Sequence, residues 1–274
     1  MRNAILNRIS TRTFKDESLS KSDIEKVIKV LKKYENVSGP FGHSFEFTFN
    51  LNNKKETNGK KIGTYGLLRN VPAYIGGVCE NNFENILDFG FVFEKIILEL
   101  TMLDLGTCWL GGTFKRKDYR RKLEENEIIP AISPVGYKAE KRSFVDRALR
   151  SAAQSNNRKS DDTLFFDYAT TKPLSDDYDI VVKQSLCLVK RGPSASNKQP
   201  WRAFVEGQNV HFYIERTPGY AKPIKYDIQM LDMGIGLSHF DVGVDYFKKK
   251  KTYNVLKDMK KIENMEYVLS VIIE

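Results

Sequence analysis

Residues 88–112 read DFGFVFEKIILELTMLDLGTCWLGG, and this stretch decides the fold. It predicts a long helix over Asp88–Leu105, which Gly106 ends, and then a short strand over Thr107–Leu110. Apolar residues keep helical spacing along the helix, and much of its remaining surface is apolar too. A helix that is apolar on most sides is buried, so we expect this one to lie at the centre of the molecule.

A second long helix is predicted over Asp227–Lys250, and it begins in the same way. Asp232-Met233-Gly234 corresponds to Asp88-Phe89-Gly90 of the first helix. A repeat of this size indicates two related units and not a solenoid, whose periods are shorter. The polar stretch 151–162 has no apolar run of its own, so we place the boundary there and predict one unit over residues 1–155 and another over 156–274.

Composition excludes several classes of protein. The chain has 274 residues, a hydrophobic fraction of 41% and a formal net charge of +9, which indicates a globular protein with a sizeable core. No stretch approaches the roughly 20 apolar residues of a membrane span, and the N-terminus lacks the apolar region of a signal peptide. The scattered cysteines and histidines predict neither disulfides nor a metal site, so we expect a cytoplasmic protein with reduced thiols, no metal and no membrane partner.

The basic charge is densest at Lys248–Lys251. No stripe of aromatic and basic residues accompanies this run, and lysines favour the last turn of a helix, so a solvated helix end is the simpler interpretation. Nucleic-acid binding is therefore not predicted. It stays open as an alternative that requires an affinity falling steeply with salt.

Two arginines and a hydroxyl follow the N-terminal helix in Arg8-Ile9-Ser10-Thr11-Arg12. Guanidinium groups offer a rigid fork of donors that suits phosphate oxygens, so this segment is a candidate anion site. Surface arginines at a helix end are the alternative for this segment taken alone.

Two further segments are candidates for ligand binding. The loop Gly192–Trp201, GPSASNKQPW, offers two hydroxyls, two amides and a lysine to a polar ligand, although it could also be an ordinary connection rich in turn formers. The stretch Cys108–Thr113 contains Gly111 and Gly112, where the backbone can approach a planar ligand closely. The alternative there is a strand exit that needs positive φ angles.

Together these segments resemble the nitroreductase family of FMN enzymes. The resemblance rests on Arg-x-Ser-x-Arg at the N-terminus, on the loop Pro-Ser-x-x-Asn-x-Gln-Pro-Trp, on residues 88–112 and on the stretch Ile129–Tyr137. It implies an α+β protein with a nitroreductase-like fold. In ordinary members a homodimer builds each flavin site from the arginine motif of one subunit and the loop of the other. Here both motifs stand in one chain, which resembles two α/β halves fused into an intramolecular pseudo-dimer around long central helices.

The resemblance also implies the roles of individual residues. Arg8, Ser10 and Arg12 would hold the FMN phosphate and ribityl chain, and Gly111 and Gly112 would lie near the flavin ring. A second basic contact and the loop from the other half would complete the cofactor site with Lys141, Arg142, Pro193, Ser194, Ser196, Asn197 and Gln199. Cys108 and Trp109 are interpreted as packing residues, and no catalytic side chain is expected because the flavin carries the chemistry.

The counterparts of the two motifs differ from them. An ungapped alignment of Ser194 with Ser38 sets Phe41 against Asn197, and the arginine motif becomes Arg158-Lys159-Ser160-Asp161-Asp162. Two carboxylates beside a phosphate are unfavourable. We therefore expect one composite FMN site per chain and a second site that has been lost.

The function implied is an FMN-dependent NAD(P)H oxidoreductase that reduces nitroaromatic or quinone-type acceptors by hydride transfer through flavin N5. The protein would work as a monomer, since the chain contains its own interface. A sensor or carrier that binds FMN without nitroreductase turnover is the alternative, and NAD(P)H consumption would separate the two.

Overall fold

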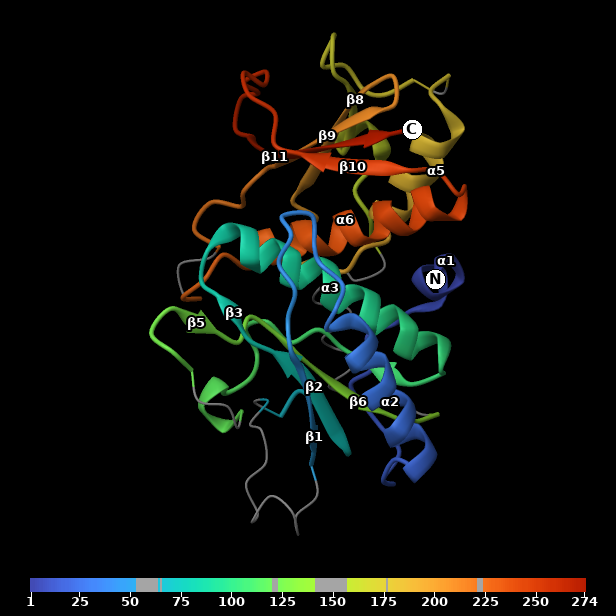
Figure 1. Ribbon diagram of the computed structural model, residues 1–274, viewed down its shortest axis with the longest axis vertical. Helices are drawn as coiled ribbons and strands as arrows, with labels where there is room; N and C mark the ends of the chain where they lie inside the picture. The colour runs from blue at the N-terminus through green and yellow to red at the C-terminus, as the bar shows by residue number, and fades with distance from the viewer. Residues whose placement is uncertain (53–63, 65, 120–122, 141–156, 176, 221–223) are drawn as a thin grey trace.

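Two β-sheets lie on opposite sides of a pair of central helices, as Figure 1 shows for the computed structural model. The structure describes residues 1–52, 64, 66–119, 123–140, 157–175, 177–220 and 224–274. Both sheets carry helices against one face, so the α+β architecture expected from the sequence is confirmed. The helices in the described residues are α1 (Arg2–Asn7), α2 (Lys21–Tyr34), α3 (Phe83–Met102), α5 (Ile180–Val189) and α6 (Ile228–Tyr246), with short 3-10 turns η1 (Arg116–Asp118), η2 (Asp161–Thr163) and η3 (Ala195–Asn197).

The two larger sheets differ in strand order. The four-stranded sheet has the order β1-β2-β6-β4, and all its neighbours pair antiparallel. The five-stranded sheet has the order β10-β11-β9-β8-β7, in which only β7 and β8 pair in parallel. A small ladder joins β3 to β5. The strands are β1 (Phe47–Leu51), β2 (Ala73–Gly77), β3 (Cys79–Glu80), β4 (Gly106–Thr107), β5 (Glu127–Ile128), β6 (Ile132–Gly136), β7 (Phe165–Asp167), β8 (Trp201–Glu206), β9 (Asn209–Ile214), β10 (Lys251–Asn254) and β11 (Glu266–Ile273).

The first central helix, α3, begins earlier than the sequence predicts. Its N-cap is Asn82, whose side chain accepts a hydrogen bond from Asn85 N at 2.9 Å, and its last residue is Met102. The predicted start, Asp88, is fully buried in the helix. Its carboxylate accepts hydrogen bonds from the backbone N–H groups of Phe41 and His43, at 3.0 Å in each case. Asp88 resembles a helix N-cap in the sequence, but its side chain accepts hydrogen bonds from the backbone of a loop that is distant in sequence.

The second central helix, α6, begins where it is expected to begin. The side chain of Asp227 accepts a hydrogen bond from Met230 N at 3.1 Å, which makes it the N-cap. The helix ends at Tyr246, four residues before the predicted end, and the lysines that follow it are exposed at Lys248–Lys250.

Helices α3 and α6 pack closely at two glycines. A Cβ added at Gly90 would overlap the carbonyl oxygen of Leu231, and one added at Gly234 would overlap the carbonyl oxygen of Leu87. The contact is reciprocal, because each glycine meets the leucine that precedes the aspartate of the other helix. Only glycine permits this approach, so the repeated Asp-x-Gly motif marks the point where the two helices cross.

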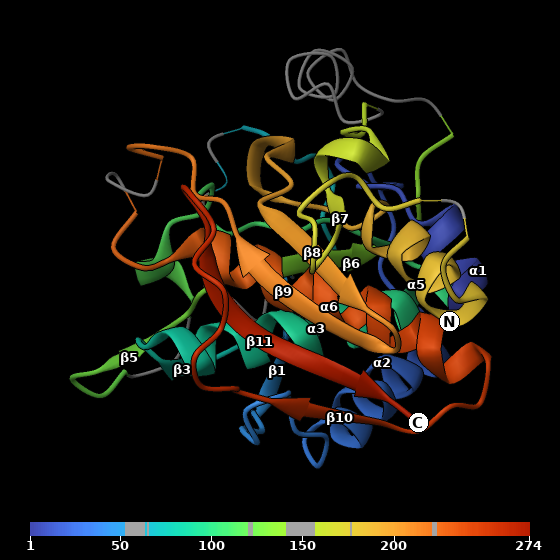
Figure 2. The same cartoon turned by 90° about the horizontal axis from the view of Figure 1, so that it is seen from above.

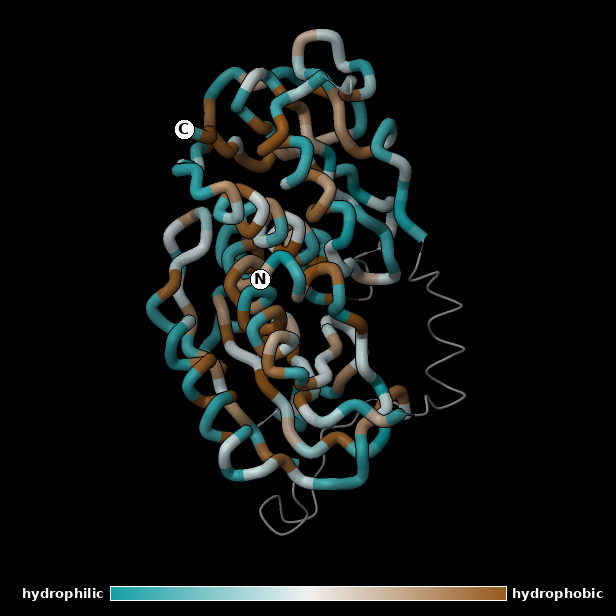
Figure 3. Tube along the Cα trace, turned by 90° about the vertical axis from the view of Figure 1, so that its right-hand side faces the viewer, coloured by the Kyte–Doolittle hydropathy of each residue, from teal (hydrophilic) through white to brown (hydrophobic). Residues whose placement is uncertain are grey.

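The remaining helices surround this pair. The five-stranded sheet covers α6 in Figure 2, and α1 contacts α3, α5 and α6. The N-terminus faces the viewer near the middle of the long axis in Figure 3. Hydrophobic side chains from both sheets and both central helices form one continuous core. In the part of the chain that the structure describes, no helix is long and apolar enough to cross a membrane.

Candidate functional site

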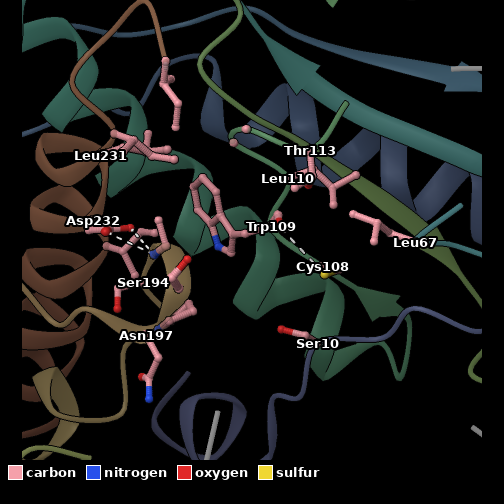
Figure 4. A pocket seen from close by; sticks show the side chains of 18 of the residues that line it. Ser10, Leu67, Cys108, Trp109, Leu110, Thr113, Ser194, Asn197, Leu231 and Asp232 are labelled. Atoms are coloured by element: carbon pink, nitrogen blue, oxygen red, sulfur yellow. Dashed lines mark hydrogen bonds between the residues drawn. The ribbon is translucent and has the colours of Figure 1, made fainter. Parts of the chain in front are cut away.

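A cavity of about 520 Å³ opens where the two parts of the molecule meet. Figure 4 shows Ser194, Asn197 and Asp232 on one side of it and Ser10, Leu110 and Thr113 on the other, with Trp109 between them. Its volume lies within the range of about 300–1,000 Å³ that is usual for small-molecule sites. The lining residues come from segments far apart in sequence: Arg8, Ser10, Arg12, Leu67, Cys108–Thr113, Arg158, Pro193–Asn197, Tyr220, Ile224, Ile228, Leu231, Asp232 and Ile235.

The N-terminal arginine motif begins at the C-cap of α1 and continues as an extended segment. Helix α1 stops at Asn7, and Arg8 already has extended backbone angles. Ser10 then forms a parallel bridge with Thr107, where Thr11 N donates to Thr107 O at 2.8 Å. Alternate side chains of an extended segment point to one face, so Arg8, Ser10 and Arg12 all line the cavity.

The loop over residues 193–199 is held in an unusual backbone conformation. Ser196, Asn197 and Gln199 all have positive φ angles, of 48°, 55° and 49°. Internal hydrogen bonds stabilise the loop, since Ser194 Oγ accepts from Gln199 N at 2.9 Å and Gln199 Nε2 donates to Asn197 O at 3.2 Å. Conformations of this kind are found where a site fixes the direction of its side chains.

The carboxylate of Asp232 closes the same loop against helix α6. Ala195 N donates to both of its oxygens, at 3.0 and 3.1 Å, and complete burial raises the pKa of this carboxyl well above its usual range. The corresponding Asp88 holds Phe41 and His43 in the other part of the molecule. Asp232 lines the cavity, and the sequence-based interpretation did not single it out as a site residue.

Arg158 is a second site residue that the sequence did not reveal. We expected it in the remnant of a separate site, but the structure places it in this cavity. Its Nη1 donates to Asn197 Oδ1 at 2.9 Å and to Asn157 O at 3.2 Å. Burial lowers the pKa of Arg158, and the nearby charges of Arg8 and Arg191 lower it further. The positive charges of Arg8 and Arg158 therefore lie near each other on the cavity lining, an arrangement that favours an anion.

Trp109 and several aliphatic side chains, three of them from α6, form the apolar walls. The indole stands edge-on to Phe93, with ring centroids 5.0 Å apart, and lines the cavity together with Ile228, Leu231 and Ile235. We interpreted Trp109 as a packing residue, whereas the structure places it on the cavity surface. Gly111 also lines the cavity, and an added Cβ there would lie 2.9 Å from Ile228 Cδ1, so the backbone runs close to this wall.

The cavity brings together most of the residues predicted from the sequence. Gln199 is not among those that line it, because its side chain is turned to Lys159 N, which donates to Gln199 Oε1 at 3.0 Å. Lys141 and Arg142 lie outside the described residues. The predicted residues that line the cavity are Arg8, Ser10, Arg12, Gly111, Gly112, Pro193, Ser194, Ser196 and Asn197.

The family with the description "Putative TM nitroreductase" matches residues 1–244. The chain belongs to this family. A search of curated proteins gives no match. Among solved structures, a "putative nitroreductase" from Thermotoga maritima MSB8 is similar over 99% of this chain and 92% of its own, with 20% sequence identity and a TM-score of 0.63. This similarity extends the family's fold over nearly the whole chain.

Two further solved structures match about half of the chain. An "FMN-dependent Nitroreductase" from Clostridium difficile R20291 is 21% identical, covers 52% of this chain and 90% of its own, and has a TM-score of 0.38. A "Putative NADH Oxidase" from Clostridium acetobutylicum is 23% identical, covers 51% of this chain and 89% of its own, and also has a TM-score of 0.38.

Proposed function

We propose that the protein is an FMN-dependent NAD(P)H oxidoreductase that reduces nitroaromatic or quinone-type acceptors by hydride transfer. The observation that carries the proposal is one cavity whose lining contains three arginines together with an indole, aliphatic side chains and glycines. FMN calls for both kinds of lining, since its phosphate is anionic and its ring is planar and largely apolar. Membership of a nitroreductase family supports the same assignment.

The arginines that line the cavity fit a phosphate. The Arg8 side chain is only 8% exposed, and within the described part of the chain its buried Nη1 has no hydrogen-bond partner. A buried donor without an acceptor is costly, and a phosphate oxygen would satisfy it. We assign Arg8, Arg12 and Arg158 to the phosphate and Ser10 to the chain that joins phosphate and ring.

The apolar side chains and the glycines that line the cavity fit the flavin ring. Bound FMN would supply the two-electron chemistry that links a reduced nicotinamide to the acceptor. The chain itself would exclude water with Trp109, Ile228 and Leu231 and would orient the ring through the loop that carries Ser194 and Asn197. The glycines allow the backbone to approach the ring closely.

We further propose that the chain consists of two fused nitroreductase-like halves, residues 1–155 and 156–274, that form an intramolecular pseudo-dimer. The reciprocal contact of Gly90 and Gly234 and the matching roles of Asp88 and Asp232 support this interpretation. The ungapped alignment sets Phe41 against Asn197, but Phe41 N donates to both oxygens of Asp88 as Ala195 N does to Asp232. Phe41 therefore corresponds to Ala195, and the residue two further on, His43, corresponds to Asn197. A histidine replaces the amide there, and we propose one FMN site per chain. We also propose that the protein is cytoplasmic and works as a monomer, because one chain supplies all the residues of that site.

Titration of the protein with FMN and with riboflavin tests the cofactor assignment, because riboflavin lacks the phosphate. We expect one FMN per chain and much weaker binding of riboflavin. Arg158→Met should weaken FMN binding by roughly ten- to hundredfold, the range for one hydrogen bond to a charged group. Riboflavin binding should not change. Arg191→Met is the matched control, since Arg191 lies beside Arg158 but does not line the cavity.

Anaerobic addition of NADH or NADPH to the FMN-loaded protein tests the activity. Bleaching of the flavin absorbance, followed by its return when a nitroaromatic or quinone is added, is the expected result. Bound FMN that neither nicotinamide reduces would point to the sensor or carrier alternative. A protein that binds no FMN would refute the cofactor assignment, and two FMN per chain would refute the single site.

A further inference from the structure

A buried acid and a histidine join the two central helices directly behind the cavity. Glu94 of α3 and His239 of α6 are both completely buried, and Glu94 Oε1 lies 2.9 Å from His239 Nε2. The other ring nitrogen, Nδ1, lies 2.9 Å from the carbonyl oxygen of Leu188. A carbonyl only accepts, so Nδ1 carries a hydrogen, and one proton is shared across the contact between Nε2 and Oε1. We call these two residues the Glu94–His239 pair.

The pair reaches the cavity through two residues that line it. Trp109 Nε1 donates to Glu94 Oε2 at 2.6 Å, and Arg8 Nε lies 3.9 Å from Glu94 Oε1. Neither Glu94 nor His239 is itself a lining residue. The indole of Trp109 is therefore held at two points, by this hydrogen bond and by the edge-on contact with Phe93.

Stability alone is a weak explanation for the pair. Replacing a buried ionic contact by apolar residues of similar size is often neutral or stabilising, so such a contact needs another reason to be present. The same two helices carry a second buried ionic contact, in which Lys95 Nζ lies 2.7 Å from Asp241 Oδ2. Neither Lys95 nor Asp241 lines the cavity. Among the described residues the Asp241 carboxylate contacts Lys95, Lys251 and Tyr253, none of which is a lining residue.

We propose that the Glu94–His239 pair positions Trp109 and Arg8. His239, which lies on α6 outside the cavity, would thus set the orientation of two side chains that line the cavity. The identity of the ligand rests on the proposed function, but the positioning of Trp109 does not. Glu94 and His239 are positioning residues in this proposal, since they act through the two side chains that line the cavity.

The indole N–H resonance of Trp109 reports its hydrogen bond in the ligand-free protein. The chain has two tryptophans, so an indole ¹⁵N label gives two signals, and Trp109→Phe assigns them. We expect Glu94→Ala and His239→Gln each to shift the Trp109 signal. Each should also weaken FMN binding about tenfold, the value of a hydrogen bond of ordinary strength. Glu94→Gln keeps an acceptor for the indole and should restore both readouts most of the way to wild type.

The matched control is Asp241→Asn, which disturbs the other buried ionic contact between the same helices. It should lower the unfolding midpoint while leaving the Trp109 signal and the FMN affinity unchanged. Equal loss of FMN affinity in this control would show that the pair has only a structural role and would overturn the proposal.

Other outcomes are separable as well. If Glu94→Ala does not fold, His239→Gln decides. An unchanged Trp109 signal in His239→Gln overturns the positioning role whether or not FMN binds. If the wild type binds FMN, an FMN affinity of His239→Gln equal to that of the wild type overturns it too. Failure of the wild type to bind FMN refutes the proposed function, and a shifted Trp109 signal would still support the pair.

Discussion

Replacing Gly234 with alanine places a methyl group where helices α3 and α6 touch. The added Cβ would overlap the carbonyl oxygen of Leu87 and lie 2.8 Å from the backbone nitrogen of Phe91. Ordinary contact begins at 3.4 Å. Both obstacles are main-chain atoms of a buried helix, so no side chain can turn aside and the helices must move apart.

The cost follows from two opposing effects. Overpacking a core costs about 1–3 kcal/mol, and a clash with the main chain belongs at the upper end of that range. Alanine recovers about 1 kcal/mol over glycine in helix propensity. We therefore expect a net loss of about 2 kcal/mol in the free energy of unfolding, which corresponds to a melting temperature lower by about 4–8 °C for a chain of this size.

Gly236→Ala is the matched control on the same helix. Its added Cβ would lie 3.1 Å from a ring carbon of Trp201 and would overlap no main-chain atom of the other helix, while the gain in helix propensity is the same. We expect it to be close to wild type in thermal and urea unfolding followed by circular dichroism. If Gly234→Ala is as stable as Gly236→Ala, the close approach of the two helices is wrong.

The double variant Gly90→Ala with Gly234→Ala tests whether the contact is reciprocal. One separation of the helices makes room for both methyl groups, so the second substitution should cost less than the first. The two losses should fall short of additivity by at least about 0.5 kcal/mol, as residues in contact do. Strict additivity would contradict a single shared crossing point.

Two further predictions concern charged groups. Tyr137 Oη donates to Asp23 at 2.6 Å, and this hydrogen bond is the main cause that lowers the pKa of Asp23 to about 2. Because the pKa of Asp23 is lower in the folded than in the unfolded protein, where it is about 4, the carboxylate stabilises the fold at pH values above about 4. This stabilisation is lost as the pH falls toward 2. Tyr137→Phe should therefore reduce the difference between the urea midpoints measured at about pH 5 and at about pH 2. Lys95→Met leaves the buried Asp241 paired with Lys251 alone and should reduce the free energy of unfolding by about 2 kcal/mol; an unchanged urea midpoint would contradict this.

The sequence was sufficient for the parts of the fold that depend on local patterns. Apolar spacing located the first central helix, and the repeated Asp-x-Gly motif marked the second. The start of α3 was predicted five residues late because an aspartate before an apolar run resembles a cap. Asp88 instead satisfies backbone donors of Phe41 and His43, which are distant in sequence.

The same reasoning explains which site residues were found. Arg8, Ser10 and Arg12 belong to one short extended segment, so their spacing in the sequence determines their common face. The sequence did not place Arg158 in this cavity, because its position depends on tertiary contacts such as the hydrogen bond to Asn197. Trp109 was interpreted as packing because its hydrogen-bond partner, Glu94, lies on another element. Tertiary partners of this kind are invisible to spacing.

The cavity lining has a consequence for binding at low protein concentration. Ser10 lies on one side of it and Ser194 and Asn197 on the other (Figure 4), and all belong to a single polypeptide. A site divided between two separate chains falls apart on dilution, because its halves must first meet. Here the connecting chain keeps the two walls at a fixed effective concentration. The measured dissociation constant of a ligand in this cavity should therefore stay the same however far the protein is diluted.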